Sequence, residues 1–388
     1  MSTDLRASIW FGLTLVASSF LLSVGFCAAL RRMAPRWGLL DRPGGHKGHS
    51  APTPLGGGVA IWLAIMIVLS GCGLLVLFGA DRLPEAIAMH AGGLRQRAGA
   101  LGWIVGMSSV MTAMGFIDDR KNLHWKPRLA IQFACAAAVA AFGARITLFG
   151  PFTHPLLGGA VTVLWIVALT NAFNMLDNMD GLAASVGLIA ALMFGAAQAA
   201  VGGRFAPAVL LIVVGALAGF LVHNHAPARL FMGDAGSNFL GFLLGSLTVA
   251  GSFFQEGAAS PLSVLAPLLV MAVPLYDMTS VILIRLSEGR SPFKGDRRHF
   301  SHRLVARGLT PPQAVWTIDL VTLACGLGAL LLHRLDVWGA GLVLAQTGCL
   351  LGVVAILELS GNRSEQTLGE ARRETAEAVE RAAGRQSD

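Results

Sequence analysis

Charged residues are scarce in this sequence of 388 residues. Asp, Glu, Lys and Arg together make up 13% of it, whereas 54% is hydrophobic. A soluble domain carries about 25% charged residues, so the composition excludes an ordinary globular protein. The formal charge of +7 does not indicate nucleic-acid binding, because the basic residues lie between apolar runs rather than along one face. We expect a polytopic membrane protein whose core is set by bilayer thickness.

Metal-ligand spacings of cysteine are also missing. All five cysteines lie inside apolar runs, and none forms a CxxC pair. Their positions predict small buried side chains rather than a zinc or disulfide framework. The first apolar run, 8–30, is too long for the core of a secretory signal and has no convincing cleavage site, so we expect a retained first span.

Long hydrophobic runs dominate the rest of the chain. Only helices satisfy their own backbone in lipid, and each span needs about 20 apolar residues. We therefore expect an all-α polytopic membrane protein with about eleven transmembrane helices, in a single transmembrane catalytic domain over 1–360. The tail, 361–388, alternates Glu and Arg with Ala at helical spacing, which predicts a solvated helix; a partner-binding role is left open. The expected spans are 8–30, 57–79, 99–117, 127–148, 156–173, 182–201, 205–223, 236–254, 261–286, 312–332 and 337–358.

The distribution of Lys and Arg predicts the orientation. If the N-terminus lies outside, the inner loops hold seventeen of these residues and the outer loops seven, with five more in the tail. Cytoplasmic loops favour Lys and Arg, so we expect the N-terminus outside and the C-terminus in the cytoplasm.

Polar residues gather at the ends of three apolar runs. Asp118 and Asp119 follow the run 99–117, five carboxylates and carboxamides crowd into 171–181, and Asp234 precedes the run 236–254. Ionisable groups at the edge of hydrocarbon are costly and usually mark a site. All three clusters fall on the predicted cytoplasmic side, although the orientation was counted from Lys and Arg alone. We interpret them as one metal-dependent phosphoryl-transfer site.

Each acidic cluster suits that chemistry and also has a simpler interpretation. A carboxylate of the pair Asp118-Asp119 could orient or deprotonate an attacking oxygen, or the pair could be solvated at the interface. Asn174 and Asp177 are three residues apart and share a helix face, where they could offer Mg²⁺ hard oxygen ligands or act as polar caps. Asp234 lies between two glycines, which allow close approach of a ligand, but it could equally cap the next helix.

Two basic loops could bind phosphate. The loop 295–304 carries His299, His302 and Arg303, and no partner spacing supports a zinc site there. Cations beside acidic clusters suit a pyrophosphate, although such a loop could serve only to set topology. In the turn-rich stretch 41–58, Lys47 or His46 could contact phosphate or base.

Seven matching segments, in order, resemble one known family. The order of motifs is similar to that of the polyprenyl-phosphate N-acetylhexosamine-1-phosphate transferases, which include the phospho-MurNAc-pentapeptide translocase. The segments are Pro-x-Pro-Leu-Gly-Gly (52–57), Gly-Phe-Ile-Asp-Asp-Arg (115–120), Lys126 with Arg128 and Gln132, Asn-Ala-Phe-Asn-Met-Leu-Asp (171–177), Asp-Gly-Leu-Ala (180–183), Phe-Met-Gly-Asp-Ala-Gly-Ser (231–237) and His-Phe-Ser-His-Arg-Leu (299–304).

The resemblance implies a reaction and a metal. A lipid-phosphate oxygen would attack the β-phosphorus of a UDP-sugar, giving a lipid-diphospho-sugar and UMP, with Mg²⁺ as cofactor and Mn²⁺ as the alternative. Asn174 and Asp234 would hold the metal, with Asp177 close by. Asp118 would activate or orient the lipid phosphate, and Asp119 would support it.

The resemblance also implies which residues meet the nucleotide sugar. The uridine pocket would be lined by Asp180, Asn224 and Phe231. Lys126 would meet phosphate. The diphosphate and sugar would be faced by His299, His302 and Arg303.

Two departures from the family pattern leave the sugar open. Asn178 stands where many members have Gly, and Ser301 stands where the third His of the loop often lies. The arginine after His302 favours transfer of GlcNAc-1-phosphate; phospho-MurNAc-pentapeptide or another UDP-HexNAc is the close alternative.

The implied location is a bacterial inner membrane, with the bilayer, UDP-sugar and polyprenyl phosphate as partners, no nucleic acid, and a homodimer left open. A carboxylate-based secondary transporter is the alternative of another class; it predicts acids near mid-span and repeat symmetry, whereas the acidic clusters here sit at span ends and no internal repeat is apparent.

Overall fold

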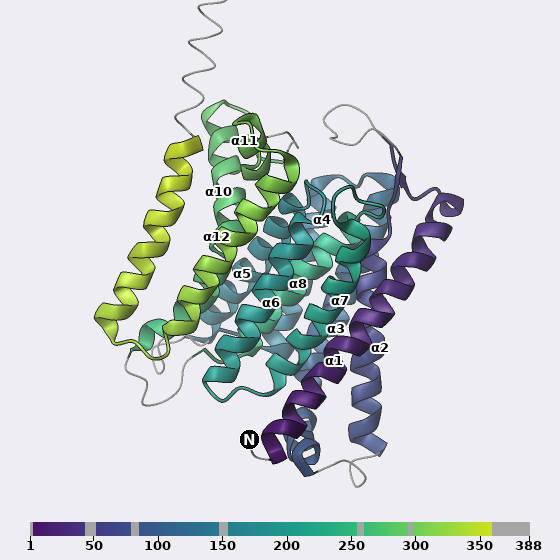
Figure 1. Cartoon of the computed structure of the whole chain (residues 1–388), viewed down its shortest axis with the longest axis vertical. Helices are drawn as coiled ribbons and strands as arrows, with labels where there is room; N and C mark the ends of the chain where they lie inside the picture. Colours follow the sequence, from purple (N-terminus) through teal and green to yellow (C-terminus); the bar gives the residue numbers. More distant parts are fainter. Residues whose placement is uncertain are drawn as a thin grey trace, which may run out of the picture.

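A bundle of helices forms the computed structural model of the protein (Figure 1). The structure describes residues 3–42, 52–78, 85–146, 154–253, 260–293, 296 and 298–358. The long helices are α1 (Thr3–Met33), α2 (Gly57–Phe78), α3 (Glu85–Lys121), α4 (Trp125–Ala138), α5 (Pro155–Leu176), α6 (Leu182–Ala200), α7 (Phe205–Asn224), α8 (Gly233–Ala250), α10 (Ala272–Ser287), α12 (Pro311–Leu331) and an unlabelled last helix, Val337–Glu358. The short elements are η1 (Ala34–Trp37), η3 (Val139–Gly143, a π-helical turn), η5 (Pro261–Leu265), α9 (Ala266–Val270), α11 (Phe300–Ala306), β1 (Leu40–Asp41) and β2 (Thr53–Pro54).

The prediction of an all-α polytopic membrane protein is confirmed. Eight helices in the described residues are long and apolar enough to cross a bilayer, and a pair bent by 63°, Pro261–Val270 with Ala272–Ser287, adds a ninth if it counts as one span. The expected runs 127–148 and 236–254 are helical too, over α4 with η3 and over α8, but neither meets that test of length and hydropathy. The count of eleven stays a prediction.

Helix α8 lies at the centre of the bundle. Every residue from Ala235 to Thr248 is buried, so protein rather than lipid surrounds it. Glycines let its neighbours approach: a Cβ on Gly115 of α3 would lie 2.2 Å from the carbonyl oxygen of Asp234, and one on Gly58 of α2 would lie 2.1 Å from the amide nitrogen of Gly236. Small residues allow such close backbone contact between helices in a membrane. The N-terminus of α8 is thereby fixed against α2 and α3.

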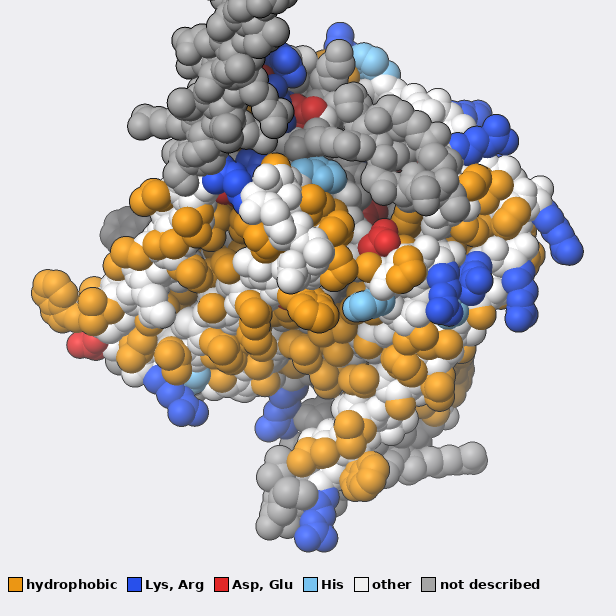
Figure 2. All heavy atoms as spheres, turned by 45° about the horizontal axis from the view of Figure 1, so that its top comes forward, with side chains coloured by type: hydrophobic (Ala, Val, Ile, Leu, Met, Phe, Trp, Pro, Cys, Tyr) orange, Lys and Arg blue, Asp and Glu red, His pale blue; other side chains and the backbone are white. Residues whose placement is uncertain are grey.

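One end of the bundle gathers the polar segments, and we call it the polar end. Helices α3, α5, α7 and α10 finish there, and α4, α6, α8 and α12 begin there (Figure 1). The N-terminus of the chain lies at the opposite end. With the top of Figure 1 turned forward, apolar side chains cover the flank of the molecule, and Lys and Arg side chains lie around the forward face (Figure 2).

A small antiparallel pair, β1 with β2, closes one side of the polar end. After β2 the chain bridges to the segment before α8: Phe231 N–H donates to the carbonyl of Pro54 at 2.9 Å, and Gly57 N–H donates to the carbonyl of Phe231 at 2.9 Å. These backbone bonds hold the Phe231–Gly233 segment against the start of α2. The predicted tail 361–388 lies outside the described residues.

Candidate active site

The three acidic clusters predicted from sequence meet at the polar end. Asn174, near the C-terminus of α5, donates from Nδ2 to Oδ1 of Asp234 at 2.6 Å and to Oγ of Ser237 at 3.0 Å. Asp118, on the last turns of α3, is 2% exposed and accepts from the backbone N–H of Leu123 at 2.6 Å. Residues from α3, α5 and α8 therefore share one site.

The guanidinium of Arg128, on α4, joins these three side chains. Its Nη1 lies 2.5 Å from Oδ2 of Asp118 and 3.6 Å from Oδ2 of Asp234, and its Nη2 donates to Oδ1 of Asn174 at 2.8 Å. Carboxylates this close repel each other, and one cation between them offsets that repulsion. Arg128 belongs to one of the sequence motifs, but its role as ion-pair partner of Asp118 and Asp234 was not predicted. Sequence spacing does not show which residues of different helices form ion pairs.

Asp119 anchors the N-terminus of α8. Its carboxylate accepts from the backbone N–H of Asp234 at 2.7 Å and of Ala235 at 3.2 Å. Free amides at a helix N-terminus attract negative charge, so this arrangement stabilises the Asp119 carboxylate and sets the position of Asp234. Asp119 supports the centre rather than pointing away from it.

Asp177 caps the C-terminal end of α5 beside the same centre. Burial, and after it the negative charges of Asp234, Asp119 and Asp180, together raise the pKa of its carboxyl to about 8, although a hydrogen bond from the backbone of Gly233 opposes this. The backbone of Gly233, the residue before Asp234, bonds to the Asp177 carboxylate, so Asp177 lies beside the centre. Its role there stays a prediction.

A row of carboxamides supports the centre from inside the bundle. Asn171 donates to Oε1 of Gln132 at 2.7 Å, Gln132 donates to Oδ1 of Asn238 at 3.0 Å, and Asn238 donates to the carbonyl of Asp234 at 2.8 Å. Gln132 and Asn238 are 1% and 0% exposed. Fully bonded buried networks of this kind fix the positions of their members, so this one fixes α4, α5 and α8 around Asp234.

A second group lies at the turn between α5 and α6. Asp180 accepts from the backbone N–H of Ala228 at 2.8 Å. Asn224, 4% exposed, accepts from Gly181 N–H at 2.9 Å and donates to the carbonyl of Leu230 at 2.9 Å. Both residues tie this turn to the segment that leads to Phe231, which is half-buried. The structure thus brings the three predicted uridine-pocket residues onto two adjoining segments.

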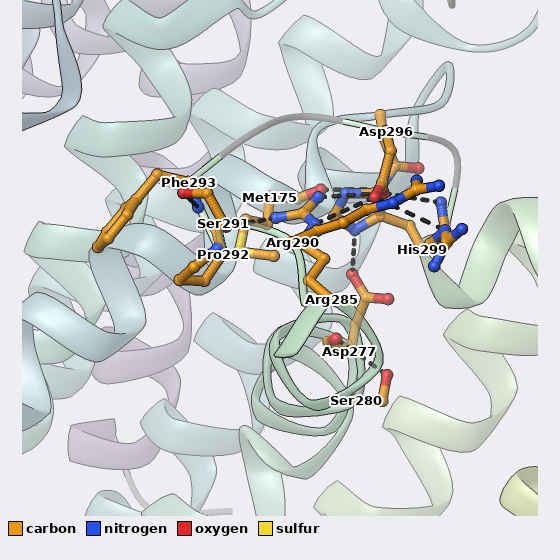
Figure 3. A network of polar contacts seen from close by, with 12 residues as sticks. Met175, Asp277, Ser280, Arg285, Arg290, Ser291, Pro292, Phe293, Asp296 and His299 are labelled. Atoms are coloured by element: carbon orange, nitrogen blue, oxygen red, sulfur yellow. Dashed lines mark hydrogen bonds and ion pairs between the residues drawn. The ribbon is translucent and has the colours of Figure 1, made fainter. Parts of the chain in front are cut away.

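The segment 298–304, which we call the histidine loop, packs on α10. Asp277, 1% exposed, accepts from the backbone N–H of Phe300 at 2.5 Å, and its Oδ2 lies 2.9 Å from Nδ1 of His299 (Figure 3). Arg285 of the same helix pairs with Asp296 at 3.1 Å. Partial burial opposes the ionisation of Asp296, but its bonds to Arg285 outweigh this and hold its pKa below the ordinary value. Asp277 was not among the predicted site residues, although a carboxylate inside the apolar run 261–286 is a usable signal.

Arg303 is tied to the last helix of the described chain. Its Nη2 lies 3.0 Å from Oε2 of Glu358 and donates to Oγ of Ser280 at 2.8 Å. Tyr276 Oη donates to the same Glu358 oxygen at 2.7 Å. The residue predicted to face the diphosphate is therefore positioned by α10 and by the end of the helix Val337–Glu358. Its neighbour His302 is half-buried on α11.

Of the two lysines predicted to contact phosphate, Lys126 lies in the described part of the chain. Lys126 is exposed in the first turn of α4, and its Nζ lies 5.7 Å from the ring centroid of Trp125. Trp125 in turn stacks on Phe293 with ring centroids 4.0 Å apart. Lys47 lies outside the described residues.

The donor set at the centre fits a hard divalent cation. Carboxylate and carboxamide oxygens of Asp118, Asn174 and Asp234 converge on one cation, the Arg128 guanidinium. In the described part of the chain, no three His, Cys, Asp or Glu side chains form a ready-made metal cage. Mg²⁺ usually takes only one or two carboxylates from the protein and completes its shell with water and phosphate, so this set suits Mg²⁺.

Comparison with known proteins gives one consistent result. The family model of glycosyl transferase family 4 matches residues 101–252. The chain is 30% identical to a probable undecaprenyl-phosphate N-acetylglucosaminyl 1-phosphate transferase of Bacillus subtilis, over 80% of this chain and 81% of that one. It is 33% identical to the decaprenyl-phosphate N-acetylglucosaminephosphotransferase of Mycobacterium tuberculosis, over 75% of each chain. It is 29% identical to the undecaprenyl-phosphate α-N-acetylglucosaminyl 1-phosphate transferase of Escherichia coli, over 80% of each.

Proposed function

The chain belongs to glycosyl transferase family 4, and from this premise we propose that it transfers N-acetylglucosamine-1-phosphate from UDP-GlcNAc to a polyprenyl phosphate. An oxygen of the lipid phosphate forms a bond to the β-phosphorus of the nucleotide sugar. The bond from that phosphorus to the oxygen bridging to the α-phosphorus breaks, and UMP leaves with that oxygen. The lipid-diphospho-sugar starts an envelope glycan.

One observation carries the proposal: Asp118, Asn174 and Asp234 reach a common point from three helices, although 60 residues of sequence separate Asn174 from Asp234. Phosphoryl transfer depends on positioning and on neutralising charge more than on covalent catalysis by the protein. A rigid convergence of oxygens and cations at the end of a membrane bundle provides both.

The residues of the centre take separate roles. Asp118, held between Arg128 and the backbone of Leu123, orients the lipid phosphate and withdraws its proton if one is present. Asp119 keeps the N-terminus of α8 in place. Asp180, Asn224 and Phe231 shape the uridine side. Lys126, at the open end of α4, meets phosphate, as does Lys47.

Magnesium is part of the proposal. Asn174 and Asp234 would hold it beside Asp177, and the ion would neutralise charge on the diphosphate. The histidine loop, with His299, His302 and Arg303, faces the diphosphate and sugar from the α10 side.

The orientation of the site is also proposed. The excess of Lys and Arg in the loops of the polar end favours the cytoplasm, where nucleotide sugars are present, with the N-terminus outside. A site at the end of the bundle lets a lipid phosphate approach from the interface and UDP-GlcNAc from the aqueous side. We place the protein in a bacterial inner membrane.

UMP release tests the proposal. Purified protein is mixed with Mg²⁺, undecaprenyl phosphate and one of three nucleotide sugars: UDP-GlcNAc, UDP-GalNAc or UDP-MurNAc-pentapeptide. The proposal expects UMP to form with UDP-GlcNAc and only when the lipid is present. UMP with UDP-MurNAc-pentapeptide alone would replace the proposed sugar, and no UMP with any of them would overturn the reaction.

A further inference from the structure

Two side chains from distant loops form a direct hydrogen bond beside the centre. Ser301 Oγ donates to Oδ1 of Asn178 at 2.5 Å across 123 residues of sequence. Ser301 is 1% exposed, and Asn178 is half-buried. Asn178 directly follows Asp177 in the turn between α5 and α6, and Ser301 directly precedes His302 on α11. The bond therefore joins the acidic turn to the histidine loop.

Both partners are held in place by their own segments. Asn178 Nδ2 donates to the carbonyl of Met175 at 2.8 Å, which leaves Oδ1 to accept from the hydroxyl. On the other side, Asp277 of α10 accepts from the backbone N–H of Phe300, the residue before Ser301. Helix α11 is thus fixed from two directions, by α10 and by the acidic turn. A short helix has little stability of its own, so such contacts decide where its side chains lie.

The bond depends on the side chains found at both positions. A residue without a side-chain oxygen at 178 leaves the hydroxyl of Ser301 without this acceptor, and Ser301 is buried, so the loss of the bond is costly. The two side chains therefore act as one unit.

We propose that Asn178 and Ser301 are a positioning pair that sets the histidine loop against the bound nucleotide sugar. The proposal rests on the proposed function and deepens it: the pair governs how His302 and Arg303 meet the diphosphate and sugar of UDP-GlcNAc. Among the hydrogen bonds and ion pairs of the described residues, none joins this pair to Asp118 or Arg128, the side of the centre assigned to the lipid phosphate. Its loss affects use of the nucleotide sugar and spares use of the lipid.

A double-mutant cycle tests the pair. Asn178→Ala, Ser301→Ala and the double variant are assayed with UDP-GlcNAc and undecaprenyl phosphate varied in turn. Removing either partner of one bond removes the same interaction, so each single variant lowers kcat/KM for UDP-GlcNAc by about tenfold, and the double variant by about the same factor rather than about a hundredfold. KM for undecaprenyl phosphate stays within about twofold.

Ser263→Ala is the matched control, because it also removes a buried serine hydroxyl, from the η5 element outside the site, and keeps wild-type kinetics. Losses that multiply in the double variant, or equal increases in KM for both substrates, would overturn the proposal. The cycle is repeated on the rise in melting temperature caused by UDP-GlcNAc, which needs no turnover. If Ser301→Ala does not fold, Ser301→Cys closes the cycle with a weaker donor of similar size.

Wild-type activity separates this proposal from the proposed function. If wild-type protein releases UMP but the cycle is additive, the pair is wrong and the function stands. If wild-type protein releases none while UDP-GlcNAc still raises the melting temperature and the cycle on that rise is non-additive, the pair stands and the transfer reaction fails. A cycle that is additive in both readouts overturns the pair.

Discussion

Asn174 on α5 donates to Asp234 on α8 at 2.6 Å, and this contact joins the densest polar segment of the sequence to the N-terminus of its most buried helix. The same carboxamide accepts from Arg128 through its oxygen. Both atoms of the amide are therefore used inside the centre. This side chain therefore links α5 to α8, two helices that pack against each other.

Replacing Asn174 tests its assignment as a metal ligand. Asn174→Ala removes one oxygen donor and leaves Asp234 with one partner fewer, so we expect the Mg²⁺ concentration for half-maximal activity to rise by about tenfold or more. Gln346→Ala is the control, because it removes an exposed carboxamide from the helix Val337–Glu358, outside the centre. An unchanged Mg²⁺ requirement in Asn174→Ala would remove this residue from the metal site.

Arg128 compensates the carboxylates of the metal-free protein. Arg128→Gln leaves Asp118 buried without its cation, so we expect a loss of unfolding free energy on the order of 1–3 kcal/mol without Mg²⁺. The variant should gain more from added Mg²⁺ than wild type does, because a competing positive charge is gone. Thermal unfolding with and without Mg²⁺ measures both effects.

Arg120→Gln is the matched control for Arg128, since Arg120 donates to the carbonyl of Trp37 outside the centre. Arg120→Gln should lower the stability of the metal-free protein by less than Arg128→Gln does. It should leave the response to Mg²⁺ unchanged. A smaller Mg²⁺ effect in Arg128→Gln than in wild type would show that the guanidinium assists the ion instead of balancing the carboxylates in its absence.

The raised pKa of Asp177 predicts a pH-dependent stability. Its pKa is about 8 in the folded protein and 3.8 for an ordinary Asp side chain, so between these limits the folded chain holds a proton that the unfolded chain releases. Stability of the metal-free protein should therefore fall as pH rises from about 4 to about 8 and show no further loss from this group above that.

Asp177→Asn removes that part of the slope. Melting temperatures of wild type and variant, measured without metal from pH 5 to 9, should converge at low pH and separate as pH rises, with the variant the more stable. Added Mg²⁺ favours the charged carboxylate and flattens the wild-type curve. Parallel curves for the two proteins would contradict the account.

Glu358 connects the last helix to the substrate loop. Glu358→Gln keeps a partner for Tyr276 but removes the charge that holds Arg303. We expect KM for UDP-GlcNAc to rise by about fivefold to tenfold with a smaller change in kcat, because Arg303 is no longer held in position. Asp336→Asn, which removes an exposed carboxylate from the other end of the same helix, should leave KM unchanged.

The sequence predicted the members of the centre better than the contacts among them. Asp118, Asn174 and Asp234 could be found because polar groups at the ends of apolar runs are costly in a membrane and need a reason. Asp277 gave the same signal inside the run 261–286 and was overlooked. The partnership of Arg303 with Glu358 could not be foreseen, because it joins positions that only the packing of three helices brings together.

The fold shows a similar division. Apolar runs predicted the positions of the eight described helices that are long and apolar enough to cross a bilayer, since hydrocarbon requires both length and hydropathy. They could not predict that α8 is enclosed by α3 and α5, where a helix needs small residues for packing more than it needs lipid-facing ones. Hydropathy alone therefore does not settle which helices span the bilayer.

The convergence of the acidic clusters is tested most directly by UMP release from Asp118→Asn and Asp234→Asn. Each substitution keeps side-chain size and removes one charge from the centre. The control, Asp336→Asn, removes an exposed charge far from the centre, from a carboxylate that accepts from the backbone N–H of Gly339. The account predicts a loss of at least about a hundredfold in both site variants, at near-wild-type melting temperature, with Asp336→Asn fully active. Normal turnover in either site variant would contradict it.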